Sequence, residues 1–427
     1  MVKVTKEEIE LHKNNFNRSN YDIPSGILNW PAQGDTSLGY TRDLAPFIDV
    51  NANGCYDPVK GDYPAIKGDE AIYWINYLID GNPLPTFEYH YMLYSYYDSI
   101  NTDLNNAVFL NYTLINRSDL NYDSIKVGLF MDSDLGQPWD DYVGCDSLTN
   151  TFYTYNGDNF DNPSSFGGYG DKIPVLGTRF LSDSLDGFMP ISLYSQHGSI
   201  TLDIHHYNYL NSNWPNGQPL TYGGSGYNTT GSVNQKTKYA FTGDPISNTG
   251  WTEGNPGFGL GSIPPGDRKM LGSIPYFSLA PEERKSIDLV FGVGYDSSHT
   301  SHLLNINDTK RVLGYAKQVY DSTKNLIPAL ASNDDCIDTT ISVPELVRQS
   351  DFNLYPNPSN GTLRIETMKS IEEILLFDLT GNIVFRQKVS QLNKVNLNLG
   401  ENLSSGIYFI QVLIEGTMLN KKLIIHY

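Results

Sequence analysis

The sequence is poor in cysteine, in basic residues and in long apolar runs. Three cysteines among 427 residues, Cys55, Cys145 and Cys336, cannot build a disulfide framework, and no two of them form a CxxC pair. One bridge is possible and none is required. The sequence holds no run of about 18 apolar residues, so we expect no transmembrane segment. The residues after Met1 lack the apolar core of a signal peptide.

Basic residues are outnumbered: 29 Lys and Arg stand against 48 Asp and Glu, a formal net charge of −19. This balance argues against nucleic acid or an anionic membrane as the main partner, because both require clustered Lys and Arg. Charged residues make up 18% of the chain and aromatic residues 12%. A disordered acidic chain contains far fewer aromatic residues than this. The composition is typical of an extracellular β-protein with long loops.

The excess negative charge is confined to the first part of the chain. Residues 351–427 contain seven basic and seven acidic side chains, so the whole excess lies in residues 1–350. A change of composition of this kind marks a domain boundary. We therefore predict a β-region at 1–330, a linker at 331–350 and a second domain at 351–427.

Most of the sequence has the composition and spacing of β-strands. The clearest strands are 107–115, its expected partner 123–130, and 285–293. Acidic residues early and a lysine late in Thr5–Asn15 predict a helix there, because this order of charges suits the helix dipole. Apolar residues on one face predict a second helix at Asp308–Asn325. The Gly-, Asn- and Ser-rich stretch 157–261 predicts long loops that join short strands.

The C-terminal domain has the pattern of a small immunoglobulin-like sandwich, with short strands roughly 8–12 residues apart. Four ordered motifs stand out: Tyr355-Pro-Asn-Pro358, Leu376-Phe-Asp-Leu-Thr-Gly381, Gly406-Ile-Tyr-Phe409 and Lys421-Lys-Leu-Ile-Ile-His426. Together they resemble the type A sorting domain of the type IX secretion system.

This resemblance implies export across the outer membrane of a Bacteroidota-type bacterium, with residues 351–427 contacting the type IX secretion machinery. It also implies an extracellular or outer-membrane surface location, and frequent removal of the sorting domain in or near the preceding linker. Such cargo needs a signal peptide to reach the periplasm. We therefore expect either a mature chain with an added Met or a longer precursor.

The first acidic constellation runs from Asp49 to Asp62. Oxygen-bearing side chains alternate along it and Gly54 is sixth, as in the D-x-[DN]-x-[DN]-G calcium loop. Lys60 stands at the twelfth position, where a bidentate Glu normally closes such a site. The alternative is an exposed Asx/Gly turn. The predicted calcium ligands are Asp49, Asn51, Asn53, the carbonyl of Cys55, Asp57 and Asp62.

The second acidic constellation follows the apolar strand that ends at Phe130. Carboxylates at this density repel one another unless a cation is present. The alternatives are a solvated acidic loop or a glycosidase acid/base pair. The predicted calcium ligands here are Asp132, Asp134, Asp140, Asp141 and Asp146.

Patches of residues 1–330 also resemble a largely uncharacterised group of secreted Bacteroidota proteins. The patches are Ile27–Pro31, Ala45–Asn51, Gly61–Asp69, Asp140–Asp146 and Pro265–Arg268. The group brings no established activity, so the resemblance implies a secreted, calcium-stabilised β-protein and no more.

Motifs of common enzymes are absent from the sequence, which contains no HExxH, GxSxG or P-loop. We therefore predict no catalytic residues and no enzyme. Aromatic residues in the Gly/Asn-rich loops, Trp214 and Trp251 among them, leave a glycan-binding module as an alternative. A hydrolase that uses Asp132, Asp134 or Asp141 is the weaker alternative.

Taken together, the sequence predicts a mainly β fold: a large calcium-binding β-sandwich region with long loops, followed by a small immunoglobulin-like β-sandwich. Calcium is the expected cofactor. The expected role is structural or adhesive, at or beyond the cell surface. Self-association or a surface glycan is the expected partnership besides the secretion machinery, and no nucleic acid is expected.

Overall fold

The structure is a computed structural model of the chain. It describes residues 1–34, 41–78, 86–163, 167–191, 200–227, 235–325, 352–378, 382–399, 403–414 and 417–426. The chain divides into two compact units, Met1–Asp338 and Thr339–Tyr427. The predicted linker at 331–350, with Cys336, lies outside the described residues. Among the described helices, none has the length and apolar character needed to cross a membrane.

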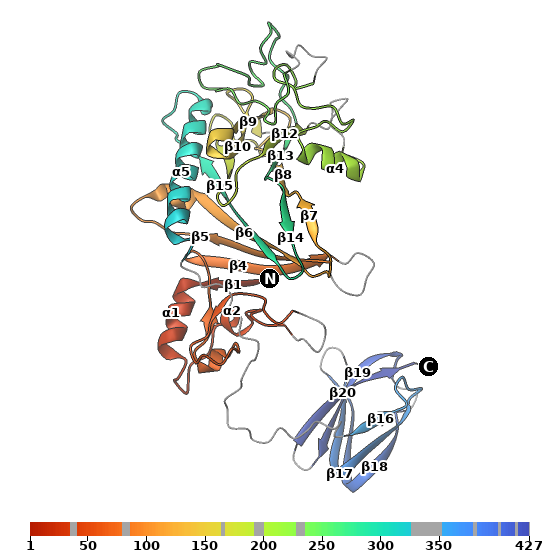
Figure 1. The fold of residues 1–427 in the computed structure, drawn as a ribbon. Coiled ribbons are helices and arrows are strands. Elements are labelled where there is room, and N and C mark those ends of the chain that lie inside the picture. The colour runs from red at the N-terminus through yellow and green to blue at the C-terminus, as the bar shows by residue number, and fades with distance from the viewer. Residues whose placement is uncertain are drawn as a thin grey trace. The chain divides into compact units, whose positions relative to one another are not determined.

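The first unit is built on an antiparallel sheet of eight strands (Figure 1). In spatial order they are β1 (Val2–Thr5), β4 (Glu70–Leu78), β5 (Phe87–Ser95), β6 (Ala107–Asn116), β15 (Arg284–Gly294), β11 (Val175–Phe180), β10 (Thr151–Asn156) and β9 (Asp141–Asp146). β-Branched and aromatic residues favour these pleated, half-buried positions. The predicted strands at 107–115 and 285–293 are confirmed as β6 and β15, which pair directly.

A second sheet packs on one face of the large sheet. It has three strands, in the order β12 (Gly187–Ile191), β13 (Lys269–Ser273) and β8 (Gly128–Asp132). Because side chains alternate between the faces of a strand, Ile287 and Leu289 of β15 share one face, and both belong to the core formed with Phe188 and Met270 of the second sheet. The predicted mainly β fold with a sandwich region is confirmed.

The opposite face of β15 is covered by α5 (Asn305–Thr323), which lies along that strand (Figure 1). Val290 points to this side and belongs to the same core as Val312 and Leu313 of the helix. Glycine lets the helix approach closely, since a Cβ at Gly294 would lie 2.2 Å from the backbone nitrogen of Thr309. The predicted helix at 308–325 is thus confirmed.

An N-terminal layer completes this side of the unit. Helix α1 (Lys6–Asn15) begins with a capping box, in which Thr5 Oγ1 accepts from Glu8 N–H at 3.1 Å and Glu8 Oε2 accepts from Thr5 N–H at 2.8 Å. This confirms the helix predicted at 5–15. The elements that follow are α2 (Ser25–Leu28), β2 (Phe47–Ile48), η2 (Pro58–Lys60) and β3 (Tyr63–Pro64).

The predicted pairing of 107–115 with 123–130 is wrong. The segment 123–130 divides between β7 (Tyr122–Ile125) and β8, and these strands pair with β14 (Phe277–Leu279) and β13. Both edges of β6 are already occupied, by β5 and β15. The other short elements are η3 (Thr102–Asn106), η4 (Ser147–Thr149), α4 (Asp203–Leu210) and η5 (His302–Leu304).

The second unit consists of β-strands around its own core. They are β16 (Asn353–Tyr355), β17 (Thr362–Phe377), β18 (Ile383–Asn398), β19 (Gly406–Ile414) and β20 (Thr417–Ile425). β17 and β18 each run through two of the short strands that the sequence suggests, and shifts of register interrupt their pairing. Leu363, Ile374, Leu397 and Ile410 are buried together between these strands. The immunoglobulin-like assignment of this unit stays a prediction.

Candidate cation-binding sites

The first predicted calcium segment lies between β2 and β3 and includes η2. Asp49 Oδ2 accepts from Gly54 N–H at 2.7 Å, and Asn51 Oδ1 accepts from Asn53 N–H at 3.1 Å. Asn53 Oδ1 accepts from Cys55 N–H at 2.8 Å. Gly54 has a φ of 76°, the left-handed region that favours glycine. Carboxylate and amide oxygens carry further lone pairs, so these bonds leave capacity for a cation.

Asp62 joins the two ends of this segment. Its carboxylate accepts from Val50 N–H at 2.8 Å and from Asp57 N–H at 2.7 Å, and the residue is fully buried. Burial raises the pKa of Asp62, and the charges of Asp49 and Asp57 add to that effect. Lys60 lies 3.4 Å from Asp57 Oδ2. Hydrogen bonds from its side chains to backbone N–H groups therefore hold this segment together.

In the second constellation, three carboxylates meet beside paired ends of β8 and β13. The oxygens of Asp132, Asp134 and Asp267 all lie within 4.8 Å of one another. Lys269 lies opposite Asp132 in the strand pair, forms an ion pair with it, and places Nζ 4.0 Å from Asp267 Oδ1. One ammonium facing three carboxylates leaves excess negative charge. No other group of three Asp, Glu, His or Cys in the described ranges meets this distance.

Asp141, the first residue of β9, is fully buried. Its Oδ2 accepts from Leu135 N–H at 3.0 Å, whereas Oδ1 has no hydrogen-bond partner among the described residues. Burial raises the pKa of Asp141 to about 8, and the charges of Asp140, Asp161 and Asp134 add to that effect. A buried carboxyl of this kind resists ionisation until a positive charge binds next to it.

Two further carboxylates flank Asp141. Asp140 Oδ1 is buried without a hydrogen-bond partner in the part of the chain that the structure describes, and burial raises the pKa of Asp140. Asp161 is fully buried and accepts from Gln137 N–H at 2.9 Å and from Tyr169 N–H at 2.7 Å. Asp161 therefore ties the loop after β8 to the loop after β10.

Sequence reasoning missed Asp161 and Asp267. Neither belongs to an alternating acidic pattern, and Asp267 is more than a hundred residues from Asp134 in the chain. Asp267 reaches the site because β13 pairs with β8. In the sequence, Pro265–Arg268 stands out only as one of the patches that resemble the group of secreted proteins, and that resemblance assigns no ligand.

Asp146 lies at the opposite end of β9 from Asp141. Asp141 faces Asn156 and Asp146 faces Thr151 in the β9–β10 pair. Burial would raise the pKa of Asp146, but the ammonium of Lys310, 3.0 Å away, lowers it overall. The structure therefore does not bring Asp146 together with the other predicted ligands.

The loop tryptophans are part of the core. Trp214 and Trp251 are 5% and 2% exposed. Trp214 Nε1–H donates to the Gly226 carbonyl at 3.0 Å, and Trp251 Nε1–H donates to the Gly224 carbonyl at 2.9 Å. Both indole rings are thus buried, and their N–H groups are bonded inside the Gly-rich region. These two rings therefore cannot stack on a glycan at the surface.

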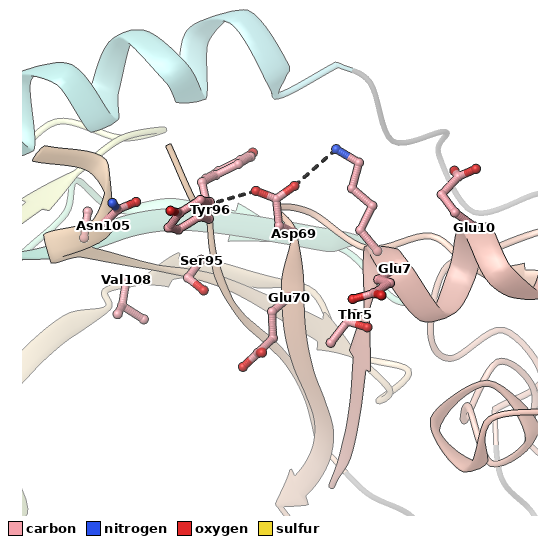
Figure 2. Close-up of a pocket in the computed structure, with 12 residues that line it drawn as sticks. Thr5, Glu7, Glu10, Asp69, Glu70, Ser95, Tyr96, Asn105 and Val108 are labelled. Atoms are coloured by element: carbon pink, nitrogen blue, oxygen red, sulfur yellow. Dashed lines mark hydrogen bonds and ion pairs between the residues drawn. The ribbon is translucent and has the colours of Figure 1, made fainter. Parts of the chain in front are cut away.

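A hollow of about 830 Å³ lies where β4 begins and β5 ends, beside α1 (Figure 2). Asp69 accepts from Lys6 Nζ at 3.1 Å and from Tyr97 N–H at 3.0 Å (Figure 2). Glu70 pairs with Lys3 at 3.0 Å, and Glu10 with Lys13 at 2.7 Å. Since lysines balance these three carboxylates, the hollow is a poor candidate for a cation site. The two acidic constellations are better placed for that chemistry.

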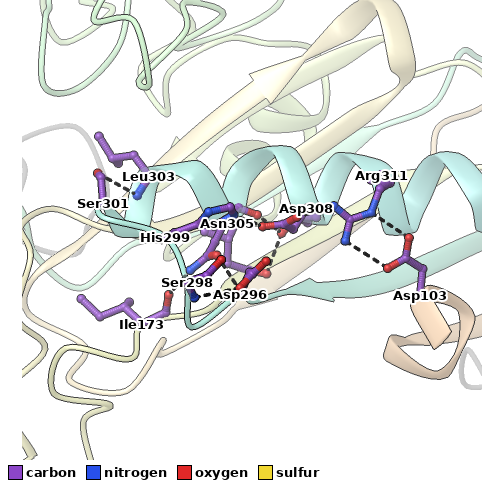
Figure 3. Close-up of polar contacts among 12 residues, drawn as sticks. Asp103, Ile173, Asp296, Ser298, His299, Ser301, Leu303, Asn305, Asp308 and Arg311 are labelled. Carbon is purple, nitrogen blue, oxygen red and sulfur yellow. Dashed lines mark hydrogen bonds and ion pairs between the residues drawn. The ribbon is translucent and has the colours of Figure 1, made fainter.

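A second polar cluster fixes the start of α5 (Figure 3). His299 Nε2 lies 2.6 Å from Asp308 Oδ2, and Asp308 also pairs with Arg311. Arg311 holds Asp103 of η3 with two contacts, at 2.8 and 3.1 Å. Each charge named here has a partner of opposite sign, so His299 helps to hold the start of the helix in place.

Residues 353–426 match the family model of the secretion system C-terminal sorting domain. None of the curated proteins matches the chain. Among solved structures, a polysaccharide lyase is similar over 83% of this chain and 39% of its own, with 8% identity and a TM-score of 0.24. The chain thus spans about two fifths of that lyase, and so low a score establishes neither a common fold nor a common activity.

The matched residues are those of the second unit, β16 to β20. This confirms the resemblance to a type IX sorting domain. The protein is cargo of the type IX secretion system, and its destination is the cell surface or the extracellular space.

Proposed function

We propose that this protein is a secreted or cell-surface structural or adhesive β-protein that calcium stabilises. The sorting domain supports the location. The acidic constellations of the first unit support the cation. Calcium is favoured over softer metals because the available donors are carboxylate and amide oxygens.

Asp141 is the observation that carries the calcium proposal. Without a cation its unpartnered Oδ1 is buried at a position where burial raises the pKa to about 8. A bound divalent ion supplies the missing partner and allows the carboxylate to ionise at neutral pH. Calcium sites in extracellular modules have dissociation constants of roughly 10⁻⁴ to 10⁻³ M, so even a modest site fills outside the cell.

A structural role follows from where the constellations lie. The first constellation lies between β2 and β4, where the only regular elements are the short η2 and β3, and the second includes the irregular loop between β8 and β9. Cys55 is disulfide-bonded and Cys145 is a free, buried thiol. Cations that crosslink acidic loops rigidify such stretches where disulfides are few.

A hydrolase is the weaker alternative. The raised pKa of Asp141 is the property that a general acid needs. Its side chain is fully buried, however, so a polymeric substrate has no access to the carboxyl. Asp132 and Asp134 instead lie together with Asp267, in an arrangement suited to ligating one ion.

Calcium removal tests the stabilising role. Protein stripped with EDTA and then titrated with calcium should gain thermal stability, because an ion that binds only the folded state shifts the folding equilibrium. At a calcium concentration about 100 times the dissociation constant, the gain is about 2.7 kcal/mol. An unchanged melting temperature, with no metal in the purified protein, contradicts the calcium proposal.

The surface role needs a separate experiment. The full chain, labelled and added to cells of a strain that lacks it, should associate with the cell surface or with itself when calcium is present. A matched sample in EDTA is the control. A chain that stays monomeric and unbound in both conditions contradicts a structural or adhesive role, and leaves calcium binding unaffected.

A further inference from the structure

Part of one face of the large sheet lies outside the hydrophobic cores found among the described residues. Tyr73 and Met92 belong to the core beneath α5, and alternation along β4 and β5 turns Trp74 and Tyr91 to the opposite side of the sheet. On that side Tyr112 of β6 packs against the core that the two sheets share. Trp74 and Tyr91 lie beyond this boundary, are partly exposed and are part of neither core.

The side chains outside the cores form rows across the strands. Trp74 lies opposite Tyr91, and Tyr91 lies opposite Tyr112. The rings of Trp74 and Tyr91 stack with centroids 4.8 Å apart and planes within 5°, and the centroids of Tyr91 and Tyr112 are 5.1 Å apart. The neighbouring row is apolar, with Ile72 opposite Leu93. Because stacking fixes the rings, this part of the sheet presents a rigid aromatic row beside an apolar one.

The hollow beside α1 lies at one end of these rows. Glu70 lies opposite Ser95, one row beyond Ile72 and Leu93. Figure 2 shows Glu70, Ser95 and Val108 on the side of the sheet away from α5, the pale cyan helix. A strand rises about 3.3 Å per residue, so the aromatic row lies roughly 13 Å from the row of Glu70. The hollow and the rows therefore form one surface, which we call the β4–β5 face.

The β4–β5 face also offers polar groups to a ligand. The hydroxyl groups of Tyr89, Tyr91 and Tyr112 make no hydrogen bond to another described residue. Asn76 lies opposite Tyr89 and is exposed, so the face runs roughly 20 Å from the row of Glu70 to that of Asn76. Lysines pair with three of the four carboxylates that line the hollow, so little net charge remains there.

We propose that the β4–β5 face binds a chain of neutral sugars. A sugar ring has apolar C–H groups and a rim of hydroxyl groups, which suit rigid aromatic rings flanked by hydroxyl, amide and carboxylate groups. A polyanion requires a basic patch, whereas the hollow is lined mainly by paired charges. This inference rests on the proposed adhesive role and names the class of its partner. It places the glycan on the sheet instead of on the loop tryptophans, which are buried.

Affinity electrophoresis of the full chain tests this inference. The probes are gels that contain a soluble neutral glucan, mannan or xylan, and a gel with alginate is the charged comparison. At least one neutral polymer should retard the chain, and alginate should not. W74A and Y91A should each weaken the retarding interaction by about tenfold or more, because a few aromatic side chains carry most of the energy of a binding surface. W139A is the matched control and should bind as the unaltered chain does. Trp139 is 48% exposed and precedes β9, the strand of the sheet farthest from β4.

A third variant and a melting temperature separate loss of binding from loss of folding. Val108 lines the hollow and is 40% exposed, so V108K should leave the melting temperature unchanged. It should still weaken binding, because a long charged side chain then occupies the hollow while the stacked rings stay in place. V108K that is retarded as strongly as the unaltered chain contradicts a site that includes the hollow.

The remaining outcomes distinguish this inference from the proposed function. The saccharide assignment is overturned if no neutral polymer retards the chain, if alginate retards it equally, or if W139A weakens binding as much as W74A. If W74A instead abolishes self-association in light scattering, the face is a contact between copies, and the adhesive role stands without the saccharide. A chain that binds neither polymer, cells nor itself contradicts both. Calcium titration remains an independent measurement, because no proposed calcium ligand lies on this face.

Discussion

Glu88 is the centre of a buried chain of hydrogen bonds in the large sheet. His90 Nε2 lies 2.5 Å from Glu88 Oε1, and Tyr73 Oη lies 2.7 Å from His90 Nδ1. Arg117 Nη2 is 3.1 Å from Glu88 Oε1, and Thr41 Oγ1 donates to Glu88 Oε2 at 2.9 Å. Burial alone would raise the pKa of Glu88, but the bonds from His90 and Arg117 outweigh it and lower the pKa to about 2.

We expect E88Q to destabilise the first unit by about 3 kcal/mol at pH 7, since a folded-state pKa near 2 against 4.5 corresponds to that energy. A lowered pKa contributes stability above pH 4.5 and loses it as the pH falls toward 2. The difference between E88Q and the unaltered protein should therefore shrink over that window in urea unfolding. E282Q is the control, because Glu282 also pairs with Arg117 but is 66% exposed. A constant difference down to pH 2 contradicts the assignment.

At the scale of elements, the close packing of α5 on the sheet depends on glycines in the strands below it. A Cβ at Gly177 would lie 2.6 Å from Thr309 Cγ2, and one at Gly292 would lie 2.9 Å from Leu313 Cδ2. Thr309 Oγ1 donates to the Val175 carbonyl at 2.9 Å, which fixes the helix on β11. Because glycine has no Cβ, these positions allow the helix to lie this close to the sheet.

We expect G294A to destabilise the protein by about 3 kcal/mol, because its Cβ meets the backbone nitrogen of Thr309 at 2.2 Å and the helix must shift. G314A is the matched control within α5, since a Cβ there has open space. It should stabilise by about 1 kcal/mol through helix propensity. Chemical denaturation measures both. Equal effects of the two substitutions would show that close helix–sheet approach is unimportant.

At the scale of the whole molecule, the two units differ in net charge and in their proposed calcium ligands. The sorting domain has equal numbers of acidic and basic residues, and the net −19 belongs to the first 350 residues. All proposed calcium ligands lie in the first unit, Met1–Asp338. The five tryptophans, at 30, 74, 139, 214 and 251, also lie there.

Calorimetry of the full chain should therefore show two unfolding transitions, and calcium should raise the temperature of one. That transition is identified by tryptophan fluorescence, which reports on the first unit alone. The transition of the sorting domain serves as the internal control and should not move. Calcium that raises both transitions equally would contradict a site confined to the first unit.

Local chemistry made several features predictable. Thr5 and Glu8 mark the start of α1 through a capping box, which depends on neighbours in sequence. The turn of the first acidic constellation is local as well, because Asp49 and Asn51 bond to backbone N–H groups a few residues away, while its binding of calcium stays a prediction. The sorting domain was recognisable from ordered motifs within one short segment.

Tertiary structure alone decided what depends on contacts between distant segments. Asp267 reaches Asp134 because β13 pairs with β8, and nothing near Asp267 in the sequence encodes that pairing. Trp214 is buried because the Gly-rich loops close around it. Asp141 and Asp146 separate because β9 is an extended strand, which places its ends far apart. The sequence thus determined the acidic first region and the exported destination, while strand pairing decided which carboxylates face one another.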